Sequence, residues 1–159
     1  MELRRVEELM DLLHACRGAR GTACLRGAPL DLHEHALQSA ALLRRSRPAD
    51  KELQVAGLVH VAGQLLRPGD PARHADHAAR AVRPLLGERV ARLIRLQDLP
   101  EEARVRESAL ADPVMDDVLL LSQADESART AGLDAGVLED WRTVLELVSA
   151  RHARLGAVD

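Results

Sequence analysis

Aromatic side chains are nearly absent from this sequence, which contains one Trp and neither Phe nor Tyr. The core must therefore be filled by Leu, Val and Ala, and this composition suits closely packed helices better than a sheet rich in aromatic and β-branched residues. The shortage also removes the side chains on which single-stranded nucleic acids stack and those that enclose a quaternary ammonium group. The composition favours an all-α protein that binds neither kind of ligand.

An excess of charge of one sign is also missing. The 22 basic and 25 acidic residues give a formal net charge of −3 and are interspersed along the chain. Without a basic patch or a polybasic tail, nucleic acid and anionic membranes are poor candidates as partners. No apolar run approaches the roughly 20 residues that a membrane-spanning helix needs. The N-terminal segment carries acidic residues, unlike a signal peptide, so we expect a cytoplasmic protein.

Cysteine is scarce as well, with only Cys16 and Cys24 in the chain. Their spacing fits neither a zinc knuckle nor a disulfide framework. We therefore expect two reduced thiols and no role for them in metal binding. Lysine occurs once, at Lys51, and the preference for Arg and Ala is typical of a bacterial genome of high GC content.

Hydrophobic periodicity predicts one domain over residues 1–159, built from about six to seven helices without strands. Residues 98–113 are acidic and carry a proline near each end, so we expect a loop there that could contain one helical turn. The expected helices cover about residues 2–17, 31–45, 50–68, 72–86, 87–97, 114–130 and 137–154.

Three residues mark expected helix boundaries. Asp31 and Asp50 precede amphipathic segments and are expected to be N-caps, because a carboxylate there can accept hydrogen bonds from the free amides of the first turn. Gly87 interrupts the periodic pattern and is expected to end the helix before it. The boundaries therefore support the all-α assignment.

Four polar residues lie on or near the apolar faces of four different expected helices: His35, His60, His74 and Asp125. A single histidine in such a position is more often a hydrogen-bonded core residue than a metal ligand. Four inward-facing donors from four helices are a more demanding pattern, and helix bundles build metal sites in this way. Imidazole and carboxylate ligands together suit iron, manganese or zinc.

Four segments follow one another along the chain: EHALQSA, AGLVHVAG, HADHAARAVRPLLGERVARLIRLQ and LLLSQADESAR. Their order and spacing resemble the HD-domain superfamily. Within the superfamily, the chain is most similar to the group that contains the phosphonate-cleaving mixed-valent diiron oxygenases and myo-inositol oxygenase. The resemblance covers about residues 20–145 and implies an all-α HD-domain bundle with a metal centre and oxygenase or phosphohydrolase activity.

By this resemblance, His35 matches the first metal ligand of the family, and Gln38 belongs to the same string. His60 matches the histidine of a His-Asp doublet, but Val61 stands where the family has the aspartate. Asp125 matches the final aspartate ligand. In the family, the doublet aspartate bridges two metal ions through its carboxylate oxygens. Because valine has no donor atom, we do not expect a dinuclear centre.

The positions around the second metal ion depart further from the family. His74 matches the third histidine and is the weaker candidate ligand, with Ala75 in place of the glutamate that follows it. Gln97 stands where the family has another histidine, and an amide is a poor replacement. Glu101 and Glu102 fall where basic residues of the family contact an anionic substrate. Carboxylates there would repel an anion, so we expect a different ligand or an acidic loop over a disused site.

Two outcomes remain open for the first metal position. A single Fe, Mn or Zn ion could be held by His35, His60 and Asp125, since two imidazoles and a carboxylate are the ligand set of non-haem iron enzymes and some zinc enzymes. Alternatively, no cofactor is bound and the three side chains hydrogen-bond to one another in a metal-free core.

The first functional expectation is a degenerate HD-domain protein that acts as a non-catalytic binding or interaction protein. The alternative is a mononuclear metal-dependent enzyme, oxygenase or phosphohydrolase-like, that acts on a small molecule in a pocket lined by Gln38, Gln64 and Gln97. Expected partners are a small molecule or a protein such as an intact paralogue, and a homodimer is possible because HD domains often pair. No catalytic residue is assigned.

The other ionisable residues are weaker candidates. His33 falls on a different helical face from the candidate ligand two residues later, so we expect it to face solvent. His77 lies one turn after His74 and could form a surface metal pair with it, but we expect a solvated helix face there instead. Asp76 and Asp98 are the carboxylates that could replace missing ligands from shifted positions.

Overall fold

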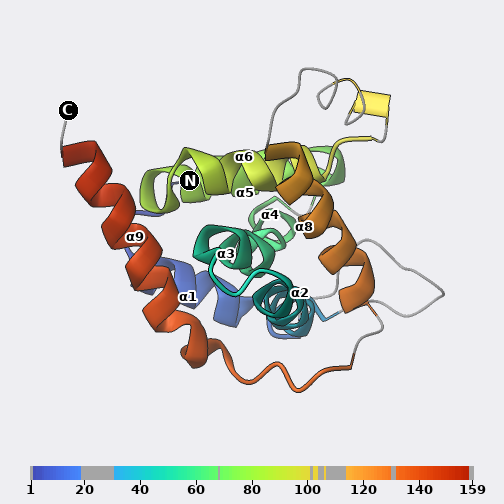
Figure 1. Cartoon of the computed structure of the whole chain (residues 1–159), viewed down its shortest axis with the longest axis horizontal. Coiled ribbons are helices and arrows are strands. Elements are labelled where there is room, and N and C mark those ends of the chain that lie inside the picture. Colours follow the sequence, from blue (N-terminus) through green and yellow to red (C-terminus); the bar gives the residue numbers. More distant parts are fainter. Residues whose placement is uncertain are drawn as a thin grey trace.

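The fold is helical throughout the part of the chain that the computed structural model describes, residues 2–18, 31–67, 69–100, 102–103, 106, 114–129 and 132–157. Within these ranges there is no β-strand, so the all-α prediction is confirmed. Figure 1 shows the arrangement. The elements are α1 (Val6–Ala15), α2 (Leu32–Ser46), α3 (Lys51–Val59), α4 (Ala62–Leu66), η1 (Pro71–Arg73), α5 (His74–Leu86), α6 (Glu88–Gln97), α8 (Val114–Ala128), η2 (Leu138–Trp141) and α9 (Arg142–Ala157).

Helix α3 lies at the centre of the bundle and contacts α2, α6, α8 and α9 (Figure 1). Helices α5 and α6 pack against each other on one side of α3, and α2 lies on the opposite side. The residues of α3 from Leu53 to Val59 are all buried. The end of α3 therefore lies in the interior of the bundle. A polar side chain at this end can contact polar groups from several neighbouring helices.

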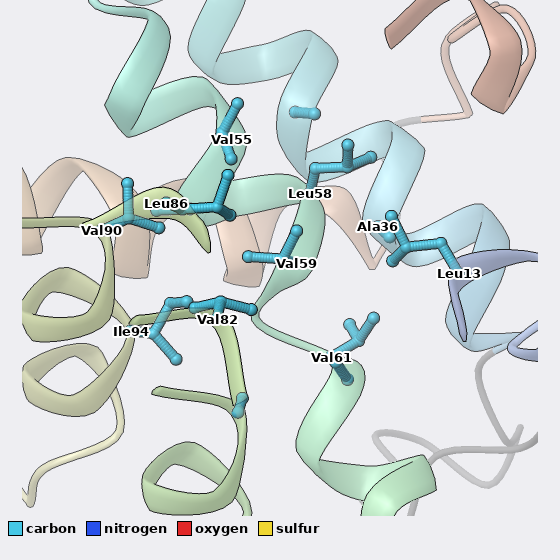
Figure 2. Packing of buried hydrophobic residues seen from close by; sticks show 14 of the residues in the cluster. Leu13, Ala36, Val55, Leu58, Val59, Val61, Val82, Leu86, Val90 and Ile94 are labelled. Carbon is cyan, nitrogen blue, oxygen red and sulfur yellow. The ribbon is translucent and has the colours of Figure 1, made fainter. Parts of the chain in front are cut away.

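The core is built from aliphatic side chains, as the composition predicts, and Val55, Val59, Val82 and Ile94 lie together in it (Figure 2). The only aromatic residue, Trp141, is 1% exposed. Its fluorescence can therefore report unfolding. None of the helices in the described ranges combines the length and the apolar character needed to cross a bilayer.

The helix caps agree with the sequence prediction. The Asp31 carboxylate accepts hydrogen bonds from the amides of His33 and Glu34, at 3.0 and 3.3 Å. The Asp50 carboxylate accepts from the amide of Leu53 at 3.1 Å. Gly87 separates α5 from α6 with φ of +96°, a conformation that favours glycine.

One expected helix, residues 50–68, is interrupted at His60 and Val61. In a continuous helix, the Gly57 carbonyl would accept a hydrogen bond from the Val61 amide. Here the Gly57 carbonyl accepts instead from Nδ1 of His60, at 2.6 Å. The side chain thus takes the place of a backbone donor, and the chain restarts as α4 at Ala62. The spacing of hydrophobic residues cannot show that a side-chain donor replaces a backbone donor at this position.

Other differences are smaller. The last helix begins with the 3-10 turn η2 before α9. Cys16 is a free, buried thiol, and burial followed by the negative charge of Asp31 raises its pKa to about 11. Cys24 and Glu101 lie outside the described residues, as does most of the expected 98–113 loop, in which residues 102, 103 and 106 are helical.

Arg89 of α6 connects three elements of the fold. Its guanidinium donates to both carboxylate oxygens of Asp50, at 2.9 and 2.8 Å, and also to Glu52 and to Asp117 of α8. Burial acts to raise the pKa of Asp50, but the hydrogen bonds from Arg89 and from the Leu53 amide outweigh it, so the pKa is lowered. Arg89 therefore stabilises the start of α3 against α6 and α8.

Replacing Arg89 by leucine is expected to lower the free energy of unfolding by about 2 kcal/mol, between the values for exposed and buried ion pairs. The loss should shrink as the pH falls below 3.8, the usual pKa of Asp50, because the protonated carboxyl no longer pairs with Arg89. Urea unfolding followed by Trp141 fluorescence measures it. Arg83→Leu is the control, because the Arg83–Glu88 pair is solvent-exposed. Equal losses in both variants would contradict this role of Arg89.

Candidate metal centre

Three side chains from three different helices converge on one point. Asp125 of α8 accepts hydrogen bonds at its Oδ1 from Nε2 of His35 on α2, at 2.7 Å, and from Nε2 of His60 at the end of α3, at 2.8 Å. One donor atom from each residue lies within 4.8 Å of the other two. Within the described ranges, this is the only group of three or more such residues with the spacing of a metal site.

Local structure fixes the two histidines. Because Asp31 starts α2, His35 falls at the end of the first turn and is 5% exposed, on the side that faces α3 and α8. His60 is placed by the interruption between α3 and α4, and its side chain is 7% exposed. Both imidazoles are therefore held where water has little access.

The second nitrogen of His60 has the partner that a metal-ligating histidine usually has. A carbonyl oxygen can only accept, so Nδ1 of His60 carries a proton and donates it to Gly57. This leaves Nε2 as the atom that faces Asp125 and that would hold an ion. Without an ion, Nε2 also donates. Burial acts to lower the pKa of His60, but the hydrogen bond to Asp125 outweighs it and the pKa is raised.

Asp125 is the shared acceptor of the group. Burial acts to raise its pKa, but the hydrogen bonds from His35 and His60 outweigh burial and hold the pKa well below its usual range. Asp125 is therefore an anion, as a metal ligand must be. Its second oxygen, Oδ2, accepts a long hydrogen bond from the amide of Gln97, at 3.4 Å, and lies 3.6 Å from Nη2 of Arg129.

His35 lacks the outer partner that His60 has. Nε2 of His35 donates to Asp125, and the buried Nδ1 on the other side of the ring has no hydrogen-bond partner. If Nε2 held an ion, Nδ1 would carry a proton and would need an acceptor. His35 is therefore the least well supported of the three.

The donor set fits one ion with a small expansion. Around a tetrahedral ion with bonds of about 2.1 Å, neighbouring ligand atoms lie roughly 3.4 Å apart. The hydrogen-bonded pairs at 2.7 and 2.8 Å would have to separate by roughly 0.6 to 0.7 Å, which side-chain rotations allow. Two imidazole nitrogens and one carboxylate oxygen suit zinc, iron or manganese.

His74, the weaker predicted ligand, does not belong to this group. It is 8% exposed at the start of α5, and its Nε2 donates to the carbonyl of Arg67 at 3.0 Å. Asp98 follows α6 and is partly exposed; partial burial and then the negative charge of Asp125 raise its pKa. Neither residue shares a metal-like cluster with Asp125 in the described part of the chain.

The three predicted pocket glutamines have different surroundings. The amide of Gln38 is 3% exposed, donates to the carbonyl of Leu133 and accepts from the amide of Leu133 at 3.0 Å. Gln38 also borders a cavity of about 250 Å³ with His35 and Arg129, but its polar atoms are already used. Gln97 donates to Asp125, and Gln64 lies half-buried on α4.

His33 does not face solvent, so that prediction is wrong. It is 6% exposed, its Nδ1 donates to the carbonyl of Leu13 at 2.9 Å, and its ring stacks on that of His14. The end of α1 covers this face of α2, which a pattern read from α2 alone does not show. His77 contacts Asp70 at 3.1 Å.

Val61 is 0% exposed and lies among aliphatic side chains at the start of α4 (Figure 2). It offers no ligand atom beside the histidine that precedes it. Two residues that the sequence analysis did not single out contribute to the site: the Gly57 carbonyl and Arg129. Arg129 follows Asp125 by four residues, and this helical spacing was the available signal.

No protein-family model matches the chain, and no curated protein matches it.

Proposed function

We propose that the protein binds one divalent metal ion, iron, manganese or zinc, through His35, His60 and Asp125. The observation that supports this most is the convergence of their three donor atoms from three helices, with the other nitrogen of His60 anchored on Gly57. In this proposal the chain is a degenerate HD-domain protein that has kept the first metal position of the family and lost the second.

The proposed roles follow from the contacts. The Gly57 carbonyl holds the His60 ring so that Nε2 faces the ion position, and burial of both imidazoles excludes water from their far sides. The Gln97 amide orients Asp125 through Oδ2. When bound, the ion would supply Lewis-acid chemistry to a small molecule at its open coordination positions.

Three features support a single ion rather than two. Val61 is buried in the aliphatic core and has no donor atom. Nε2 of His74 is hydrogen-bonded to the backbone of Arg67. Gln97 offers a neutral amide where the HD-domain resemblance expects an imidazole. A second ion would therefore lack both a bridging carboxylate and a complete ligand set.

A metal-free binding or interaction protein is the second candidate. It is favoured by the direct hydrogen bonds of both imidazoles to Asp125, which occupy the Nε2 atoms and the Oδ1 atom that would otherwise hold the ion. In that case the three residues form a polar network that fixes α2, α3 and α8 relative to one another.

Replacing His60 by alanine is expected to abolish metal binding, because it removes the ligand with the best-defined orientation. Protein purified without chelator should contain close to one equivalent of metal by elemental analysis, and the H60A variant almost none. His77→Ala is the matched control, because His77 also contacts an aspartate but lies outside the triad. Absence of metal after reconstitution with Fe(II), Mn(II) and Zn(II) would refute the proposal and favour the metal-free candidate.

A further inference from the structure

Arg129 lies beside the triad, and its hydrogen-bonding groups are poorly used. Its Nη2 is 3.6 Å from Oδ2 of Asp125, and its Nε is 3.7 Å from the exposed carboxylate of Glu126. The side chain is only 16% exposed. Nε and Nη1 are buried without a hydrogen-bond partner. An arginine in this state needs an explanation, since a buried N–H without an acceptor is destabilising.

Electrostatics gives that explanation. A guanidinium stays protonated at any physiological pH, so Arg129 brings a fixed positive charge into the site. The nearest buried anion is Asp125, whose Oδ1 is occupied by the two histidines. Arg129 faces the other oxygen, Oδ2. Its charge therefore lies on the side of the carboxylate away from the imidazoles, where it offsets part of the negative charge of Asp125.

The cavity next to Arg129 argues against an anionic ligand as its missing partner. Besides Arg129 and His35, the carboxylates of Asp31 and Glu34 line this cavity of about 250 Å³. An anion that approached Arg129 through it would meet two negative charges. The contact with Asp125 is therefore the closest ion pair of the guanidinium, and its other ion pair is with the exposed Glu126.

We propose that Arg129 is an internal cation that competes with a metal ion for Asp125. It stabilises the metal-free triad and weakens metal binding, so it sets the metal concentration at which the site fills. The metal-binding half of this inference rests on the proposed function, and the stabilising half does not. Arg129 is thus a positioning residue that acts through Asp125, and it touches neither the ion nor a substrate.

The size of the effect follows from Coulomb repulsion. A divalent ion bound to Asp125 would lie close to the fixed charge, but the Arg129 side chain can move part of the way towards solvent, which limits the repulsion. Removal of the charge is therefore expected to tighten metal binding by about tenfold.

Titration with Co(II) tests the inference, because the visible spectrum of this ion reports coordination directly. We expect Arg129→Met to bind Co(II) about tenfold more tightly than the natural chain, and Arg129→Lys, which keeps the charge, to stay within about threefold. Arg80→Met is the control for net charge, because Arg80 lies exposed on α5, and it should leave the affinity unchanged. Equal or weaker binding by Arg129→Met would overturn the inference.

The same variants separate this inference from the proposed function. If only Arg129→Met binds Co(II), the proposed function fails for the natural chain and the inference is supported. If no variant binds Co(II), the proposed function is wrong, and thermal unfolding in EDTA decides the stabilising half. Arg129→Met should then unfold at a lower temperature than Arg80→Met. The unfolding temperature of Arg129→Lys, which keeps the charge, should be higher than that of Arg129→Met. A midpoint at or above that of Arg80→Met would overturn it.

Discussion

Replacing Gly63 by alanine is expected to destabilise the protein by about 3 kcal/mol or more, at the upper end of the range for overpacking. A Cβ atom on Gly63 would lie 1.8 Å from the carbonyl oxygen of His74, where α4 meets the start of α5. Backbone atoms cannot turn aside as a side chain can, so α4 and α5 would have to separate. That shift would also disturb the hydrogen bond from His74 to Arg67.

The direction of the effect distinguishes this close approach from helix propensity. In an ordinary helix, a change from glycine to alanine is favourable by about 1 kcal/mol. Gly69 is the matched control, because a Cβ atom there would have no heavy atom within 4 Å. Urea unfolding followed by Trp141 fluorescence should give a large loss for Gly63→Ala and a small change for Gly69→Ala. A neutral or stabilising Gly63→Ala would show that the two helices do not approach as closely as described.

The features that sequence predicted well depend on local chemistry. Apolar spacing predicts helices because one face must be buried, and Asp31 and Asp50 predict helix starts because a carboxylate can satisfy free amides of the next turn. Both are decided within a few residues. The aliphatic core and the single buried Trp141 also follow from composition.

The features that sequence missed depend on contacts between distant segments or on one side chain. The helix over residues 50–68 is interrupted because the His60 imidazole takes the Gly57 carbonyl, and no periodicity in apolar residues records that choice. His33 is buried because α1 covers it, and its ring is hydrogen-bonded to the carbonyl of Leu13, 20 residues earlier in the chain. Helical spacing gives the direction of a side chain, but not which neighbour covers it.

The candidate site lies between these cases. Sequence named His35, His60 and Asp125, and the structure brings them together across 90 residues of chain. Sequence left open whether the three side chains bind an ion or hydrogen-bond to one another, and it did not show that both hydrogen bonds share one oxygen of Asp125. The shared oxygen makes Asp125 the centre of the metal-free network, and under the proposed function Asp125 would also be a ligand of the ion.

Replacing Asp125 by alanine is expected to cost the metal-free protein about 3 kcal/mol. Two buried imidazole N–H groups would lose their acceptor and Arg129 would lose its nearest carboxylate, which is the situation of a broken buried ion pair. In the variant, His60 can become neutral by losing a proton. No unpaired positive charge is then left on its buried ring, and this limits the cost. Asp70→Ala removes a more exposed partner from His77 and should cost less than about 0.5 kcal/mol. Urea unfolding in EDTA compares them, and equal costs would contradict a central role for Asp125.

The pH range of this cost follows from the two pKa shifts. The pKa of Asp125 lies below its usual 3.8, so its contribution is present above about pH 4 and is lost as the pH falls towards the folded-state value. The pKa of His60 lies above its usual 6.5, so its contribution is complete below about pH 6.5 and is lost as the pH rises through the folded-state value. The difference in unfolding free energy between the natural chain and Asp125→Ala should therefore be largest between these limits. A difference that grew steadily above pH 8 would be inconsistent with an imidazolium–carboxylate pair.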